Sequence, residues 1–329
     1  MRAILRGGDL LARAFLWRDF TTFVRVCFLA VASESGVLRA LREPRTVRQL
    51  TETLGIARVD LLDALLALGV AVGELSRDAE LFRLRGRRAH LLAGGEGDAF
   101  GALTEEWLHY DAAVFCELTR MLHGAPARDY LRATATIIAR SSRILEPFVG
   151  AYLEDLVRRR APRRVLDVGC GSAVYLRYAS AAPGAGGVGI DVDPDVVALA
   201  RSNLADWGIA DRFEIVEGDV RRRAGDLRGP FDLVQLLNNI YYFEPAERIA
   251  LFALLRSLLA DGGALIVVSA TEGSTVAIRA FDLVLRSTAG CWALPARDEL
   301  ASQLRESGFS RVRRTELAPG QTLDAFLAT

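Results

Sequence analysis

Two apolar runs that end in polar turns carry the residues best suited to chemistry in this chain. The segments are VLDVGCGSA at 165–173 and GVGID at 187–191. Gly169 and Gly171 allow the backbone to turn tightly and to approach a ligand closely. Asp191, at the tip of the second run, can accept hydrogen bonds from ribose hydroxyls. The spacing predicts a βαβ unit that binds a nucleoside.

An acidic residue, Asp167, lies before the first glycine, and the run from Asp167 to Ala173 lacks the third glycine that a dinucleotide site usually has. A carboxylate there would repel a pyrophosphate and suits a cationic or amino-bearing ligand. The segment therefore resembles the first motif of class I S-adenosylmethionine-dependent methyltransferases. In that interpretation Asp167 contacts the amino end of the donor or stabilises the turn, and Cys170 offers its backbone.

Later segments resemble the same family in order and spacing. EIVEGDV at 214–220 is similar to the third strand, FDLVQLLNNIYYF at 231–243 to the fourth strand with its active-site loop, and 258–329 to the remaining strands. The resemblance implies an α/β fold, a Rossmann-like seven-stranded sheet, with S-adenosylmethionine at the carboxyl ends of the strands. The implied donor-binding residues are Asp167, Gly169, Cys170, Gly171, Asp191, Val192, Asp219, Val220 and Asn238. Arg221–Arg223 are interpreted as a solvated face.

Composition narrows the class of protein. The 329 residues suggest two domains, 51% of them are apolar, and the formal net charge is zero, which disfavours a polyanionic partner. All basic residues are arginine, so lysine chemistry is excluded. Four distant cysteines predict neither a metal site nor disulfides and indicate a cytoplasmic protein. No stretch resembles a membrane span, so no membrane partner is expected.

Residues 1–95 are expected to form a separate, mostly helical domain. Short amphipathic helices at 46–54 and 59–68 are followed by two apolar stretches around a turn, which is a winged-helix pattern. Asp60 and Asp63 on the second helix would oppose DNA phosphates, so no nucleic-acid partner is predicted. The segment resembles the N-terminal dimerisation domain of small-molecule O-methyltransferases, which implies a homodimer.

Residues 96–160 are expected to be a helical linker that covers the acceptor pocket of the catalytic domain, 161–329. Predicted helices cover 100–124 and 129–159. Aromatic residues on a helix beside a catalytic domain can form a pocket wall. The predicted acceptor-binding residues are Trp107, Tyr110, Asn239, Tyr242 and Trp292.

The sequence alone does not single out a residue that would act as the base and remove a proton from the acceptor. Methyl transfer from a sulfonium is an in-line displacement, and a base is needed only where the acceptor must lose a proton. Plant-like O-methyltransferases have a histidine base after the fourth strand, whereas this chain has Asn238 and Asn239 there. An amide such as Asn239 orients an acceptor but takes no proton. Three alternatives stay open: His109 or His123 reaches the pocket, Tyr241 or Tyr242 orients or deprotonates the acceptor, or no base is needed.

The sequence thus predicts a homodimeric, cytoplasmic methyltransferase that uses S-adenosylmethionine and a small-molecule acceptor, with O-methylation in secondary metabolism favoured. C-, N- or S-methylation is the alternative that needs no histidine. Two further hypotheses are a relative that binds the donor without transferring methyl, and a regulator that acts on DNA through its winged helix.

Overall fold

The computed structural model describes residues 9–95, 97–318 and 322–329. The chain divides into two compact units, Met1–His109 and Tyr110–Thr329. Among the described residues, no helix is both long and apolar enough to cross a membrane.

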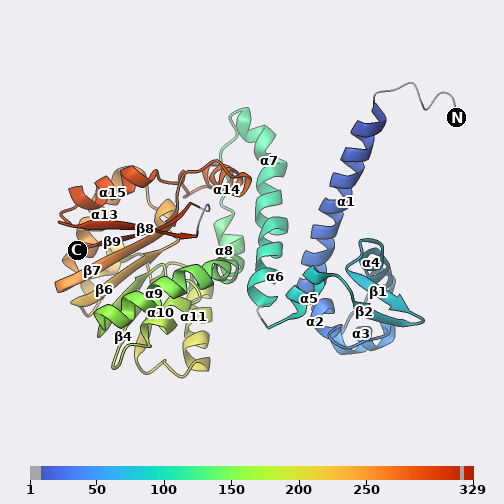
Figure 1. The fold of residues 1–329 in the computed structure, drawn as a ribbon, viewed down its shortest axis with the longest axis horizontal. Helices are drawn as coiled ribbons and strands as arrows, with labels where there is room; N and C mark the ends of the chain where they lie inside the picture. Colours follow the sequence, from blue (N-terminus) through green and yellow to red (C-terminus); the bar gives the residue numbers. More distant parts are fainter. Residues whose placement is uncertain (1–8, 96, 319–321) are drawn as a thin grey trace. The chain divides into compact units, whose positions relative to one another are not determined.

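The first unit is mainly helical and contains one small hairpin (Figure 1). Its core is formed by buried side chains such as Phe28, Leu66 and Phe82. A capping box between Thr46 and Gln49 begins the third helix, and Gly55, with φ of +65°, ends it. The elements are α1 (Asp9–Glu34), α2 (Val37–Ala40), α3 (Val47–Leu54), α4 (Val59–Ala71), β1 (Leu75–Asp78), β2 (Leu81–Leu84), α5 (Arg87–Ala93) and α6 (Gly97–Glu106).

A π-helical segment, η2 (Trp107–Asp111), leads into the second unit, which is built on a seven-stranded sheet in the order β5-β4-β3-β6-β7-β9-β8. The strands β3 to β7 are parallel, and β9 is antiparallel to both β7 and β8. The predicted seven-stranded α/β fold is confirmed. The strands are β3 (Arg164–Val168), β4 (Gly186–Asp191), β5 (Phe213–Glu217), β6 (Phe231–Leu237), β7 (Leu259–Ala270), β8 (Val312–Ala318) and β9 (Leu323–Ala328).

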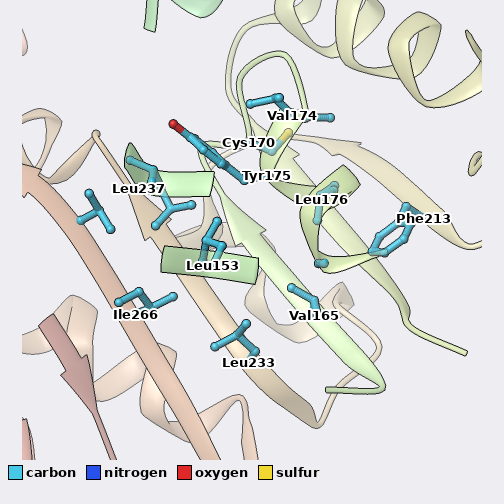
Figure 2. Packing of buried hydrophobic residues seen from close by; sticks show 14 of the residues in the cluster. Leu153, Val165, Cys170, Val174, Tyr175, Leu176, Phe213, Leu233, Leu237 and Ile266 are labelled. Carbon is cyan, nitrogen blue, oxygen red and sulfur yellow. The ribbon is translucent and has the colours of Figure 1, made fainter. Parts of the chain in front are cut away.

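Helices cover both faces of this sheet, so each face has its own apolar core (Figure 1). One core joins side chains of β3, β6 and β7 to helices, as Figure 2 shows for Leu153, Leu233 and Ile266. The helices of this unit are α7 (Ala112–Leu122), α8 (Leu131–Ser141), α9 (Glu146–Arg160), α10 (Val174–Ala179), α11 (Pro194–Asp206), α12 (Val220–Arg223), α13 (Arg248–Ser257), α14 (Val276–Arg286) and α15 (Arg297–Glu306), with 3-10 segments η3 (Ser142–Leu145), η4 (Ala224–Asp226), η5 (Ile240–Tyr242) and η6 (Pro245–Glu247).

The parallel strands β3, β4, β5 and β6 all end at one edge of the sheet. In open parallel sheets this edge is where ligands bind. The fold therefore brings four segments that are far apart in the sequence to a single place.

Candidate functional site

A cavity of about 480 Å³ opens in the second unit at the carboxyl ends of β3 to β6. Its size is within the range of small-molecule and cofactor sites. The wall includes most of the predicted donor-binding residues, namely Gly169, Cys170, Gly171, Asp191, Val192, Asp219, Val220 and Asn238.

The turn after β3 is shaped by residues in the left-handed backbone region. Gly169 and Gly171 have φ of +65° and +53°, and Ala173, with φ of +63°, adopts the same region despite its side chain. The backbone N–H groups of Gly169 and Cys170 donate to the carbonyl of Ile190, at 2.7 and 3.1 Å. These bonds fix the turn against the end of β4.

Asp191 ties this turn to the end of β4 through its side chain. Its Oδ2 accepts from the Gly171 N–H at 3.0 Å, and its Oδ1 accepts from the Asp193 N–H at 3.2 Å. Burial raises the pKa of the Asp191 carboxyl, while these backbone hydrogen bonds lower it. Each oxygen keeps an acceptor site, and the residue lies in the cavity wall. Asp191 is therefore equipped to accept hydrogen bonds from a diol.

Asp167 lies behind the wall of the cavity. It is 1% exposed, and its Oδ2 has no hydrogen-bond partner among the described residues. Burial, with the nearby Asp191 carboxylate, holds its pKa well above the usual range. Burial likewise raises the pKa of the Cys170 thiol, which makes that thiol unreactive.

The end of β6 supplies the other side of the cavity. Asn238 has φ of +56°, a conformation that asparagine tolerates better than most residues. The Asn239 side chain is buried, and its Nδ2 donates to the Val168 carbonyl. Tyr241 and Tyr242 form an edge-to-face pair with ring centroids 4.9 Å apart. All four residues line the cavity.

Two predicted acceptor-side residues of the first unit, Trp107 and His109, are partly exposed. His109 Nε2 lies 3.1 Å from Glu34 Oε2.

Three other predicted residues, Tyr110, His123 and Trp292, belong to the same unit as the cavity but are outside its wall. Tyr110 is buried and its hydroxyl lies 2.8 Å from Thr288 Oγ1. His123 is exposed at the end of α7, and the backbone N–H of Trp292 donates to the Tyr241 carbonyl at 2.9 Å. Trp292 thus supports the loop after β6 from behind.

Several wall residues were not singled out from the sequence, including Asp129, Arg132, Tyr175, Arg221 and Phe243. Tyr175 follows the glycine turn by four residues, and Arg221 directly follows Asp219 and Val220, so proximity to the motifs was the available signal. Within the described ranges, no group of three or more His, Cys, Asp or Glu side chains is arranged to hold a metal ion.

Comparison with known proteins identifies similar domains and folds. Residues 165–263 match the family model described as a methyltransferase domain. A release factor glutamine methyltransferase of Bradyrhizobium diazoefficiens is 31% identical over 189 residues, which is 56% of this chain and 59% of that protein. The chain therefore spans about three fifths of that relative's length.

Two solved structures resemble the whole chain. The mitomycin 7-O-methyltransferase MmcR is 19% identical with a TM-score of 0.76, covering 97% of each chain. Human N-acetylserotonin methyltransferase, solved with S-adenosylmethionine, is 15% identical with a TM-score of 0.73, covering 98% of each chain.

Proposed function

We propose that this chain, which has the class I methyltransferase fold, transfers the methyl group of S-adenosylmethionine to a small-molecule acceptor. The observation that carries the proposal is the convergence of Gly171, Asp191, Asp219 and Asn238 on one cavity at the carboxyl edge of the sheet. These residues belong to separate sequence motifs, and each has the type that the resemblance assigns to donor binding.

The residues present fit the donor. Asp191 would accept from the ribose hydroxyls, and Asp219 with Val220 would lie beside the adenine. Two polar groups of the wall, the Tyr175 hydroxyl and the Asn238 Nδ2, are buried and have only a weak interaction with each other in the described part of the chain. Weakly paired buried polar groups are costly, and a ligand with a carboxylate and an ammonium group would satisfy them.

The donor, when bound, supplies a methyl group that is already activated as part of a sulfonium. The chain then has to orient the acceptor and exclude water. Tyr241 and Tyr242 form an aromatic wall, and Leu131 and Ile138 of α8 add apolar surface. Asn239 is fixed by its bond to the Val168 carbonyl and would orient an acceptor with its free Oδ1.

No histidine is among the described residues that line the cavity. Burial raises the pKa of Tyr175 and of Cys170, which disqualifies both as bases near neutral pH. These observations favour an acceptor that ionises by itself, such as an acidic hydroxyl, with Tyr241 or Tyr242 orienting it. O-methylation is therefore the leading reaction, and it is the reaction stated in the name of MmcR. The same wall also fits N-, C- or S-methylation.

We also propose that the protein is a homodimer. The helix α1 exposes large apolar side chains that are close together in the sequence: Phe15 54%, Leu16 70%, Trp17 71%, Phe20 53% and Phe23 58%. Exposed apolar side chains gathered on one segment in this way mark an interaction surface. A Trp17→Glu/Phe20→Glu variant should sediment as a monomer in analytical ultracentrifugation, and a dimer that survives both changes would refute this role of α1.

Four cysteines without disulfides suit the reducing cytoplasm that we propose as the location of the protein.

A nucleic-acid partner is not proposed. Asp60 and Asp63 are exposed on α4, the helix that would have to enter a groove, and Asp60 pairs with Arg58 at 2.6 Å. Carboxylates in that place oppose phosphates.

Calorimetric titration with S-adenosylhomocysteine tests the donor site. We expect a Kd on the order of micromolar, about −8 kcal/mol, for the wild type. Asp191→Ala should weaken binding tenfold or more, whereas Asp195→Ala, an exposed carboxylate outside the wall, should leave it unchanged. Absence of binding by the wild type would refute the proposed function. Isotope-labelled donor with a panel of phenols, amines and thiols then separates an active enzyme from a protein that only binds.

A further inference from the structure

Arg221 makes several hydrogen bonds to the carboxylate of Asp219 at the wall of the cavity. Its Nε donates to both oxygens, at 3.1 Å to Oδ1 and 3.0 Å to Oδ2, and its Nη2 donates to Oδ2 at 2.6 Å. The Arg221 backbone N–H also donates to Oδ1, at 2.8 Å. Because the guanidinium bonds to both oxygens, the pairing fixes the plane of the carboxylate and places a positive charge beside it.

The same guanidinium also reaches the loop after β6. Its Nη1 donates to Glu247 Oε2 at 2.7 Å, and its Cζ lies 5.3 Å from the centre of the Phe243 ring. A second arginine, Arg248, donates from Nε to the Phe243 carbonyl at 3.2 Å. Arg221 therefore joins the end of β5 to the loop that carries Asn239 and the tyrosine pair.

The neighbouring arginines are placed differently. All three arginines are exposed, but Arg222 and Arg223 lie outside the cavity wall, and Arg223 pairs with Asp226 at 3.1 Å. Arg221 and Asp219 both line the cavity, with side chains 42% and 20% exposed. One member of a run of three arginines is thus built into the site.

We propose that Arg221 is a positioning residue that holds the Asp219 carboxylate oriented to accept a hydrogen bond from the exocyclic amine of the donor's adenine. This inference rests on the proposed function, in which Asp219 lies beside the adenine. A carboxylate offers about four acceptor sites. Three N–H groups of Arg221 bond to this carboxylate, and the Nε–H is shared between its two oxygens. The carboxylate side chain remains 20% exposed in the cavity wall, where one N–H of an amine would bond to it.

The charge state agrees with this role. The hydrogen bonds from the Arg221 side chain lower the pKa of the Asp219 carboxyl, so it stays ionised and is an acceptor only. An ionised acceptor makes a stronger hydrogen bond to a neutral amine than a protonated carboxyl would. Without Arg221, Asp219 would keep its charge but lose its fixed orientation.

The test compares two ligands in three proteins by calorimetric titration. The ligands are S-adenosylhomocysteine and its 6-deamino analogue, which carries hydrogen in place of the exocyclic amine. The proteins are the wild type, Arg221→Gln and Arg222→Gln. Arg222→Gln is the matched control, because it removes the same charge one residue away without touching the hydrogen bonds to Asp219.

In the wild type, removal of the amine should weaken binding about tenfold, the usual worth of a hydrogen bond to a charged group. That penalty should fall to about twofold in Arg221→Gln and stay about tenfold in Arg222→Gln. A residue with a merely structural role would weaken both ligands equally and leave the ratio unchanged. An unchanged ratio in Arg221→Gln, or no penalty in the wild type, would overturn the inference.

Failure of the wild type to bind either ligand is a distinct result, because it refutes the proposed function itself. Circular dichroism and thermal unfolding establish that each variant folds. Should Arg221→Gln fail to fold, Arg221→Lys takes its place: it keeps the charge but not the planar fork, and its penalty should also fall below that of the wild type.

Discussion

Replacing Gly169 by alanine should disturb the site through one identifiable contact. A Cβ on Gly169 would lie 2.2 Å from Asn239 Nδ2, far inside contact distance. Asn239 would have to swing away and lose its buried bond to the Val168 carbonyl. At φ of +65° the alanine itself is strained by about 1 to 2 kcal/mol. Leaving the buried carbonyl unpaired adds about 1 to 3 kcal/mol, so Gly169→Ala should destabilise the unit by about 2 to 5 kcal/mol.

A double-mutant cycle with Asn239→Ala tests this account. Asn239→Ala alone should cost about 1 to 3 kcal/mol, because it removes the same hydrogen bond. In that background Gly169→Ala should cost only its backbone strain of about 1 to 2 kcal/mol, since nothing is left to displace. The double variant should therefore be about as stable as Gly169→Ala, with a coupling energy of about −1 to −3 kcal/mol.

Urea denaturation, with hydrogen exchange of the β3 and β6 amides as a local measurement, gives the four free energies of unfolding. Gly171→Ala is the control. Gly171 has a similar φ of +53°, but a Cβ added there would meet only the Ala139 Cβ, at 4.0 Å, which is ordinary contact. Its effect should add to that of Asn239→Ala without coupling. Additive effects for Gly169→Ala and Asn239→Ala would refute the contact argument.

Three other predictions follow from buried groups. Burial raises the pKa of Asp167, so the folded chain keeps a proton that the unfolded chain releases above about pH 4. The free energy of unfolding therefore falls as pH rises from there toward the folded pKa, and Asp167→Asn should flatten this decline in melts from pH 4.5 to 7.5. Asp324 is fully buried and pairs with two partly exposed arginines and a buried threonine, so Asp324→Ala should cost about 2 kcal/mol in urea denaturation; a loss under about 0.5 kcal/mol would contradict this. Iodoacetamide at pH 8 should label the exposed Cys116 and spare Cys170 until urea is added, as peptide mass spectrometry would show.

The sequence was sufficient to predict the seven-stranded fold and the convergence of Asp191 and Asp219, for one physical reason. Strands of a parallel sheet all present their carboxyl ends at the same edge, so residues placed just after separate apolar runs must meet there. The glycine turn could be predicted equally well, because Gly169 and Gly171 adopt backbone angles that few other residues tolerate.

Side-chain partnerships were beyond this kind of inference. A run of three arginines resembles a solvated face, and only the positions of Asp219, Glu247 and Phe243 distinguish Arg221 from its neighbours. Asp167 has the sequence position of a ligand-binding carboxylate, yet β3 buries it behind the turn.

Local interruptions of elements were missed as well. The single helix expected over 100–124 is broken by the π-helical segment Trp107–Asp111, which periodicity does not reveal. The strand β7 begins at Leu259 and runs through Gly262 and Gly263, because Leu259 already pairs with Phe231.

The division of labour among the wall residues explains how one fold can serve different acceptors. Asp191 is tied to the Gly171 N–H, Asp219 to Arg221, and Asn239 to the Val168 carbonyl. Each of these polar side chains lines the cavity and also makes a hydrogen bond to the backbone or to a neighbouring side chain. Changing one of them would therefore disturb the donor site. The wall also contains apolar side chains, such as Leu131 and Ile138 on α8, which contact a ligand through their shape. Acceptor choice can therefore change through them by shape alone, while the donor site stays intact.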